Sequence, residues 1–185
     1  MFIEITAAIL GLIQGVLVML NRKSNWIFYI LQMGFLLLFS LVNKLYGDVV
    51  NNAIYLVFGI AGLIRWNKPE KDSDITTAGP VEKAVYAAII AAGTIAGAYL
   101  LSGTDDPLPL LDAFTTVSSL AATYYMVRRK LDTWIIWFII DIFYALEYFI
   151  LPDQALCLFA LNCIWTVMAV VSYVNWRRIM KEAAK

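Results

Sequence analysis

The most chemically informative residues of this chain lie in one stretch, where tryptophans, a carboxylate and tyrosines recur at helical spacing. Trp134, Trp137, Asp141, Tyr144 and Tyr148 occupy positions 0, 3, 7, 10 and 14 of that stretch, so a helix places all five on one face. Aromatic faces attract cations by about 0.5–2 kcal/mol, and a neighbouring carboxylate adds charge compensation. The pattern predicts half of a cage for a flat ring, and a cationic ring would suit it best.

Carboxamides and aromatic rings in other apolar stretches supply partners for that cage. The further candidates are Gln32, Asn52, Tyr55, Asn162 and Trp165. Polar groups inside hydrocarbon are costly and tend to face a cavity, so we expect these side chains to complete a binding site. Interhelical hydrogen bonding or core packing is the alternative for each of them, as it is for Asp141 and Tyr144, and an interfacial anchor is the alternative for Trp134. Tyr148 is assigned to packing or to an interfacial aromatic belt.

The composition places these residues in a membrane protein. The 185 residues are 62% hydrophobic and 15% charged, with a formal net charge of zero and no histidine. Soluble domains are about 45–50% apolar and about 25% charged, so a water-soluble globule is excluded and the lipid bilayer is the expected environment. The zero net charge argues against nucleic acid as a partner. The absence of histidine excludes imidazole bases and ligands, and we predict no catalytic residues, no cofactor and no metal.

Apolar runs long enough to cross about 30 Å of hydrocarbon recur along the whole chain. We expect seven spanning helices, at residues 2–20, 26–43, 49–66, 83–102, 108–127, 132–151 and 154–176. Polar, charged or proline-containing segments separate them, including the turn Tyr46-Gly47-Asp48, the charged linker 68–74 and Pro152-Asp153. The first run lacks the basic start of a signal peptide, so we interpret it as the first mature helix.

The basic residues orient the helices, because cytoplasmic loops of membrane proteins carry an excess of lysine and arginine. With the N-terminus outside, Lys44 alone of the fourteen basic residues lies outside. The thirteen cytoplasmic ones are Arg22, Lys23, Arg65, Lys68, Lys71, Lys83, Arg128, Arg129, Lys130, Arg177, Arg178, Lys181 and Lys185. This asymmetry supports an odd number of spans in a cell (inner) membrane, with a cytoplasmic C-terminus. Trp26, Trp66 and Trp176 flank cytoplasmic basic residues, and we interpret them as interfacial anchors.

An internal repeat relates the two halves of the chain. Five positions of the third and seventh runs match at an offset of 110 residues: Asn52 and Asn162, Tyr55 and Trp165, Gly59 and Ala169, Gly62 and Ser172, and Trp66 and Trp176. Two parallel three-helix units need an extra crossing between them. We therefore predict an all-α integral membrane fold of 3+1+3 helices. Residues 1–67 form the first repeat, 68–103 the charged linker and linker helix, and 104–185 the second repeat.

Several of these motifs together resemble the PnuC family of vitamin transporters. The motifs are Asp112-Ala-Phe-Thr-Thr-Val-Ser-Ser, Trp134-Ile-Ile-Trp137-Phe-Ile-Ile-Asp141, Tyr173-Val-Asn-Trp176-Arg-Arg, Asn25-Trp26, Leu45-Tyr46-Gly47-Asp48 and Gly62-Leu-Ile-Arg-Trp66. The resemblance covers nearly the whole chain. By motif match, Trp134 and Trp137 correspond to aromatic site residues and Asp141 to their neighbour, with Gln32, Asn52 and Asn162 as looser matches.

The resemblance implies a fold related to the sugar-transporting SWEET proteins and facilitated diffusion of a small-molecule vitamin. It implies nicotinamide riboside or, in sister branches, thiamine, riboflavin or deoxynucleosides, trapped by a cytoplasmic kinase, and a homotrimer. The chain departs from the family where Gly62-Leu63-Ile64 replaces a Gly-Trp-Tyr-like group, and where Glu147 occupies a usually uncharged stretch. These departures leave the vitamin open.

Other functions are compatible with parts of the sequence. Proton or sodium coupling at Asp112 or Asp141 would make the protein an ion-coupled carrier. An intramembrane aspartyl protease would need a Gly-x-Gly-Asp context that neither aspartate has. ATP-driven transport would need a glycine-rich phosphate-binding loop, which the sequence lacks. A receptor that does not transport remains, although polar stripes on several helices favour a cavity.

Overall fold

The computed structural model describes residues 2–68, 75–150 and 156–184, and these residues form seven helices. They are α1 (Phe2–Met19), α2 (Asn25–Val42), α3 (Tyr46–Trp66), α4 (Pro80–Leu101), α5 (Pro109–Val127), α6 (Thr133–Ile150) and α7 (Leu156–Ala183). The expected linker residues 69–74 and the expected break at Pro152-Asp153 lie outside the described residues. Helix α3 begins at Tyr46, within a predicted turn, and α7 continues seven residues past its predicted end.

Five of these helices are long and apolar enough to cross a membrane. They are α2, α4 and α6 over their full lengths, Asp48–Trp66 of α3 and Phe159–Ala183 of α7. The described apolar part of α1, Ile5–Met19, is shorter. Helix α5 carries Asp112, Thr116 and Ser119 along its length, which lowers its hydropathy. Length and composition therefore support five of the seven predicted spans.

The turn after α1 and the turn after α5 have the same backbone structure. The Arg22 N–H donates to the Leu17 C=O at 2.8 Å, and the Lys130 N–H donates to the Tyr125 C=O at 2.9 Å. Such a bond across five residues is typical of the Schellman motif, in which a left-handed residue ends the helix. Among the described residues, Asn21, Lys44 and Arg129 are left-handed, with φ of 53°, 58° and 49°. The turn after α2 has the same structure, because the Leu45 N–H donates to the Ser40 C=O at 2.9 Å. Three helices of the bundle therefore end in the same way.

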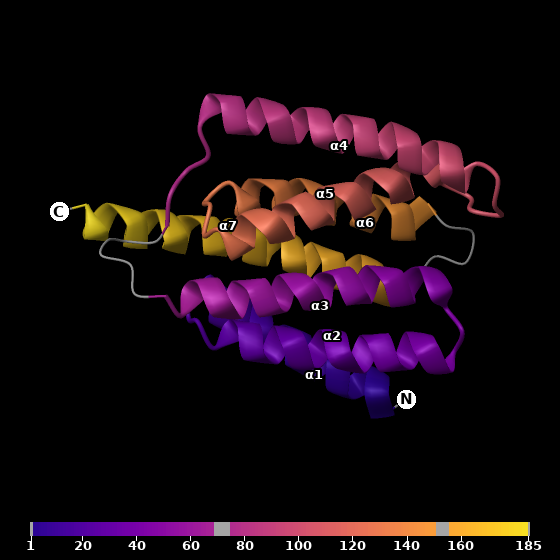
Figure 1. The fold of residues 1–185 in the computed structure, drawn as a ribbon, viewed down its shortest axis with the longest axis horizontal. Helices are drawn as coiled ribbons and strands as arrows, with labels where there is room; N and C mark the ends of the chain where they lie inside the picture. The colour runs from indigo at the N-terminus through magenta and orange to yellow at the C-terminus, as the bar shows by residue number, and fades with distance from the viewer. Residues whose placement is uncertain (1, 69–74, 151–155, 185) are drawn as a thin grey trace.

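Six helices form a closed ring. Among the described residues, α1 packs against α2, α2 against α3, α3 against α5, α5 against α6, α6 against α7, and α7 against α1. Helix α4 packs against α5 alone and lies outside this ring, at the top of Figure 1. The start of α1 and the end of α7 lie at opposite ends of the bundle (Figure 1).

Polar contacts tie the start of α4 to the turn between α5 and α6. The Asp132 carboxylate accepts the Ala78 N–H at 2.6 Å through Oδ2 and pairs with Lys83 Nζ at 2.8 Å through Oδ1. Glu82 Oε1 pairs with Arg128 Nη1 at 2.9 Å. Helix α4 also packs along α5. It is therefore attached to the α5–α7 part of the molecule both by this packing and by the polar contacts at its first turn.

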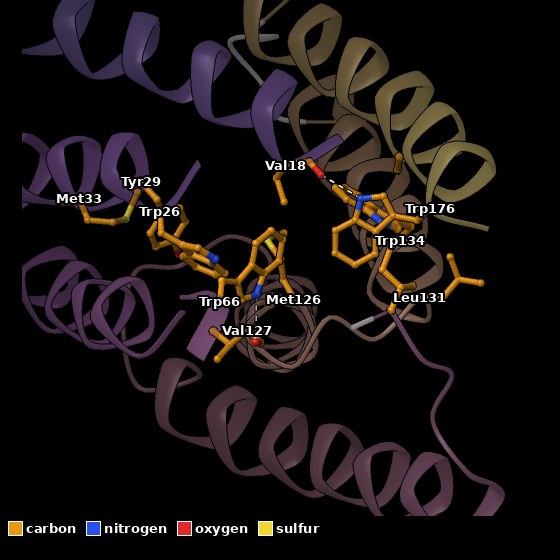
Figure 2. Close-up of a cluster of buried hydrophobic side chains, with 12 residues drawn as sticks. Val18, Trp26, Tyr29, Met33, Trp66, Met126, Val127, Leu131, Trp134 and Trp176 are labelled. Carbon is orange, nitrogen blue, oxygen red and sulfur yellow. Dashed lines mark hydrogen bonds between the residues drawn. The ribbon is translucent and has the colours of Figure 1, made fainter. Parts of the chain in front are cut away.

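The core at one end of the ring is a row of four tryptophans (Figure 2). Trp26, Trp66, Trp176 and Trp134 follow one another with ring centroids 5.5, 5.9 and 5.3 Å apart. We call these four residues the tryptophan row. All four side chains are buried, and Trp26 and Trp176 are 0% exposed. The interpretation of Trp26, Trp66 and Trp176 as interfacial anchors is therefore wrong, because their rings pack against one another between helices.

Trp66 and Trp176, the two central members of the row, each donate a hydrogen bond to the adjacent helix of the ring. Trp66 Nε1 donates to the Val127 C=O at 3.1 Å, and Trp176 Nε1 donates to the Val18 C=O at 2.9 Å, as the dashed lines of Figure 2 mark. Both acceptors lie in the last turn of a helix, where carbonyls lack intrahelical partners. These bonds join α3 to α5 and α7 to α1.

Candidate functional site

The ring of six helices encloses a cavity of about 350 Å³ next to the tryptophan row. Every helix of the ring contributes lining residues, and α4 contributes none of those described. Cavities of about 300–1,000 Å³ are typical of small-molecule sites. Trp134 belongs both to the row and to the lining, and Val18 both receives the bond from Trp176 and lines the cavity. The row therefore forms the end of the cavity near the α1–α2 and α5–α6 turns.

Eight of the nine predicted site residues line this cavity. They are Gln32, Tyr55, Trp134, Trp137, Asp141, Tyr144, Asn162 and Trp165. They come from α2, α3, α6 and α7, because one helix face of each points to the centre of the ring. The structure thus brings together residues up to 133 positions apart, while their part in binding stays a prediction.

Asn52 is the predicted residue that does not line the cavity. Its Nδ2 donates to Ser40 Oγ of α2 at 3.2 Å. Asn51, the preceding residue, lines the cavity in its place. One residue turns a helix by about 100°, so Asn51 faces the cavity and Asn52 faces α2. A part for Asn52 in binding stays a prediction.

The α6 stripe supplies the indoles and the carboxylate. Trp134, Trp137, Asp141 and Tyr144 all line the cavity, and Asp141 is 6% exposed. The Nε1 atoms of Trp134 and Trp137 are buried and have no hydrogen-bond partner among the described residues. Buried donors without acceptors are costly, and both of these donors belong to residues that line the cavity. Tyr148 stacks on Tyr144 with ring centroids 6.3 Å apart.

Helices α3 and α5 add a hydrogen bond across the ring. The Tyr55 hydroxyl lies 2.5 Å from Ser119 Oγ. Ser119 Oγ also donates to the Thr116 C=O at 2.9 Å. A hydroxyl has a single proton, so we infer that Tyr55 donates to Ser119. Both residues line the cavity, so this bond lies in its wall and joins α3 to α5.

Several lining residues were not selected from the sequence. They include Gly11, Gln14 and Gly15 of α1, Asn51 of α3, and Ser119 and Thr123 of α5. A signal existed for Gln14, a carboxamide midway along an apolar run, and for the polar stripe of α5. Nothing local marked the two glycines, because a glycine contributes to a site only through what lies against it.

The lining carries one charged residue. Asp141 is that residue, and none of the described residues of the lining is lysine or arginine. A buried carboxylate among aromatic rings favours a cationic or neutral ligand over an anion. In the part of the chain that the structure describes, no three Cys, Asp or Glu side chains lie close enough together to hold a metal ion. The arrangement is suited to binding and releasing a flat organic molecule.

Comparisons with known proteins were made for the whole chain. A family model described as "Nicotinamide mononucleotide transporter" matches residues 1–178. The nicotinamide riboside transporter PnuC of Neisseria mucosa is 24% identical over 189 residues, covering 95% of this chain and 72% of that protein. The riboflavin/roseoflavin transporter RibM of Streptomyces davaonensis is 28% identical over 149 residues, covering 75% of this chain and 68% of that one.

A solved structure has the same fold. The crystal structure of the vitamin B3 transporter PnuC matches with a TM-score of 0.76 and 23% sequence identity, over 98% of this chain and 83% of that one. At this identity the match concerns the arrangement of helices. The match covers nearly the whole chain, and α4 is included in it.

Proposed function

The chain belongs to the nicotinamide mononucleotide transporter family, and on that premise we propose that it carries nicotinamide riboside across a membrane by facilitated diffusion. The observation that carries the proposal is the cavity of about 350 Å³ whose wall holds the tryptophans Trp134 and Trp137 and the carboxylate of Asp141. Its PnuC relative is named as a nicotinamide riboside transporter, which supports the same substrate.

The charge of the cavity supports the nucleoside over its phosphate ester. A phosphate group carries about −1.5 to −2 charge at neutral pH and is recognised by arginine, lysine or helix N-termini. The described lining has Asp141 and no lysine or arginine, so a mononucleotide would meet like charge. Nicotinamide riboside carries a pyridinium cation that suits the Asp141 carboxylate and the indoles, and its ribose hydroxyls offer acceptors to Trp134 and Trp137.

We propose that the helices form a 3+1+3 arrangement, with residues 1–67 and 104–185 as parallel repeats and 68–103 as linker. Two observations support it: the closed order of six helices and the paired tryptophans of the row. Under a two-fold relation α1 corresponds to α5, α2 to α6 and α3 to α7. The contacts α3–α5 and α7–α1 are then equivalent seams between the halves.

The mechanism we propose is alternating access, in which one half rocks on the other along these two seams. The cavity would open to each side in turn, and the substrate would cross without an ion or ATP. All seven helices would span the membrane, with the N-terminus outside and the C-terminus in the cytoplasm. The basic turns at Arg22 and Lys130 support this orientation, and the inner membrane is the expected location.

Facilitated diffusion equalises concentrations, so net uptake needs a step that consumes the substrate inside. We propose that a cytoplasmic kinase does this, because a phosphorylated product would be excluded from a cavity that lacks lysine and arginine. The family resemblance also supports a homotrimer, and the mass of the purified protein in detergent checks it.

Uptake of labelled nicotinamide riboside into liposomes that contain only this protein tests the proposal. We expect saturable uptake that stops at equal concentrations inside and outside, with or without sodium and proton gradients. Thiamine and riboflavin serve as competing substrates. Accumulation above the outside concentration would replace the passive mechanism by an ion-coupled one. Preferred uptake of thiamine or riboflavin would show that the proposed substrate is wrong. Binding without any uptake would favour a receptor.

A further inference from the structure

Two glycines of α1 face the cavity on one side of that helix. Gly11 and Gly15 are four residues apart, so they lie within about 40° of each other around the helix axis. Both line the cavity. A glycine has no side chain, so a side chain from another helix can occupy the space next to its backbone.

The space in front of Gly11 is filled by the Gln32 amide. A Cβ added to Gly11 would lie 2.5 Å from Nε2, 3.0 Å from Cδ and 3.3 Å from Oε1 of Gln32. All three atoms of the amide group beyond Cγ are therefore against the α1 backbone. Gln32 itself lines the cavity, so its amide borders the space that a ligand would occupy.

The space in front of Gly15 is filled by the Trp165 ring. A Cβ added to Gly15 would lie 2.7 Å from Cζ3 and 3.0 Å from Cη2 of Trp165, and 3.2 Å from Met168 Cε. The benzo end of the indole thus abuts α1 directly. Trp165 belongs to α7, so this contact also crosses one of the two seams between α1–α3 and α5–α7.

Other glycines of the chain have a different surrounding. A Cβ on Gly97 of α4 would meet the Cβ of Ala113 at 3.0 Å and its Cα at 3.7 Å, which is the close approach of two helices. A Cβ on Gly62 would meet the Trp26 ring, inside the tryptophan row. A Cβ on Gly34 of α2 would meet nothing within 4 Å. A Cβ on Gly59 of α3 would meet Ile30 Cγ1 at 2.9 Å and Tyr29 Cδ1 at 3.0 Å, and Tyr29 lines the cavity. Gly11 and Gly15 differ from Gly59 because they line the cavity themselves, as do the two side chains against them.

We propose that Gly11 and Gly15 are positioning residues, which set where the Gln32 amide and the Trp165 ring stand in the cavity and thereby which ligand the cavity accepts. The inference rests on the proposed function and deepens it. The ligand class is that of the proposed function, a planar aromatic ring joined to a sugar, in which the ring can stack on an indole and the hydroxyl groups can bond to a carboxamide. A methyl group at either glycine would push its partner into the volume that the ligand needs.

Gly11→Ala and Gly15→Ala test the inference, with Gly34→Ala as the matched control on a neighbouring helix. We expect the dissociation constant for nicotinamide riboside to rise about fivefold or more in both α1 variants, from the loss of about one hydrogen bond or ring contact. The control should stay within about twofold of the parent protein, because its new methyl group has open space. Ligand binding is measured with purified protein in lipid nanodiscs.

A second readout needs no ligand. With 7-fluorotryptophan incorporated, which places the fluorine on Cζ2 and away from the two ring atoms against Gly15, the Trp165 resonance is assigned by its loss in Trp165→Phe and then compared in the glycine variants. We expect Gly15→Ala to move the Trp165 resonance and Gly34→Ala to leave it unchanged. An unmoved resonance together with unchanged affinity would overturn the inference.

A double variant separates positioning from an effect on the α1 backbone. In the Trp165→Phe background the smaller ring leaves room for a methyl group, so Gly15→Ala should weaken binding less than it does alone. Gly11→Ala with Gln32→Asn should behave likewise. An equal loss in both backgrounds would overturn the inference. If the parent protein bound none of the vitamins while the Trp165 resonance still moved, the proposed function would fail and the positioning role would stand.

Discussion

At the scale of single residues, the site is defined by groups that the protein leaves unsatisfied. The indole N–H groups of Trp134 and Trp137 are buried without acceptors among the described residues, and Asp141 lines the same cavity. An unmade hydrogen bond to a buried group costs about 1–3 kcal/mol, so a ligand that completes these bonds gains affinity. This is the physical reason to expect that the α6 stripe contributes most of the binding.

Trp137→Ala should abolish saturable uptake while the protein remains folded in the membrane. The change removes both an unpartnered donor and a large aromatic face from the cavity wall. Phe138→Ala is the matched control, because Phe138 is the next residue of α6 and its side chain is exposed on the outside of the bundle. Uptake in liposomes and the elution profile in detergent measure the two effects. Normal transport by Trp137→Ala would remove this indole from the site.

Asp141→Asn should weaken binding of cationic ligands selectively. The change keeps the shape of the side chain and removes its charge, so nicotinamide riboside should lose about tenfold in affinity, corresponding to about 1.4 kcal/mol. Riboflavin, which has no such cation, should compete for the site as well as before. A titration with both ligands checks this. An equal loss for both would mean that Asp141 orients other side chains instead of compensating a cation.

At the scale of elements, the tryptophan row and the matching turns hold the helices in order. Trp66 and Trp176 each donate an indole N–H to a carbonyl in the last turn of the adjacent helix. The Val18 C=O also accepts the Asn21 N–H of the turn at 2.9 Å. The end of α1 is therefore bound both by its own turn and by a helix 158 residues away in sequence.

Trp176→Ala should destabilise the protein by about 3–5 kcal/mol, because it leaves a cavity in a fully buried cluster. Trp176→Phe should cost less, since a ring still fills part of the space and the Val18 carbonyl keeps its turn hydrogen bond. Tyr99→Ala, on the exposed face of α4, is the aromatic control and should have little effect. Thermal unfolding in detergent ranks the three variants. A Trp176→Ala variant as stable as the Tyr99→Ala variant would contradict the structural role of the row.

At the scale of the whole molecule, the two seams α3–α5 and α7–α1 decide how the halves can move. The seams differ in chemistry around the cavity. The first is joined by the Tyr55–Ser119 hydrogen bond, and the second by the contact of Trp165 with Gly15. In the proposed mechanism one half rocks on the other and either breaks or keeps these contacts in each cycle, so the maximal transport rate should respond to them.

Tyr55→Phe and Ser119→Ala should change the maximal rate by similar factors, and the double variant should change it no further, because both remove the same hydrogen bond. The coupling between them should be about 1 kcal/mol, or roughly fivefold. Ser118→Ala is the control, since its buried hydroxyl has no partner among the described residues. Transport assays over a range of substrate concentrations separate the rate from the affinity. Additive effects of the two changes would contradict a shared bond between the seams.

The sequence alone determined the helices, and most of the residues that it predicted for the site line the cavity. The lengths of the apolar runs predicted seven helices, because spanning length is a local property of the chain. The helical period placed Trp134, Trp137, Asp141 and Tyr144 on one face, and all four line the cavity. These predictions succeeded because residues three or four apart on one helix share their direction wherever the helix lies.

The tertiary structure alone decided how the helices face one another. Whether Asn51 or Asn52 enters the cavity depends on the rotation of α3, which one position of register reverses. A tryptophan beside basic residues looks the same in sequence whether its ring meets lipid or, like Trp176, another ring. The pockets that receive Gln32 and Trp165 exist only where another helix brings those side chains against a bare backbone. Such facts depend on the relative placement of segments distant in sequence, which no local pattern encodes.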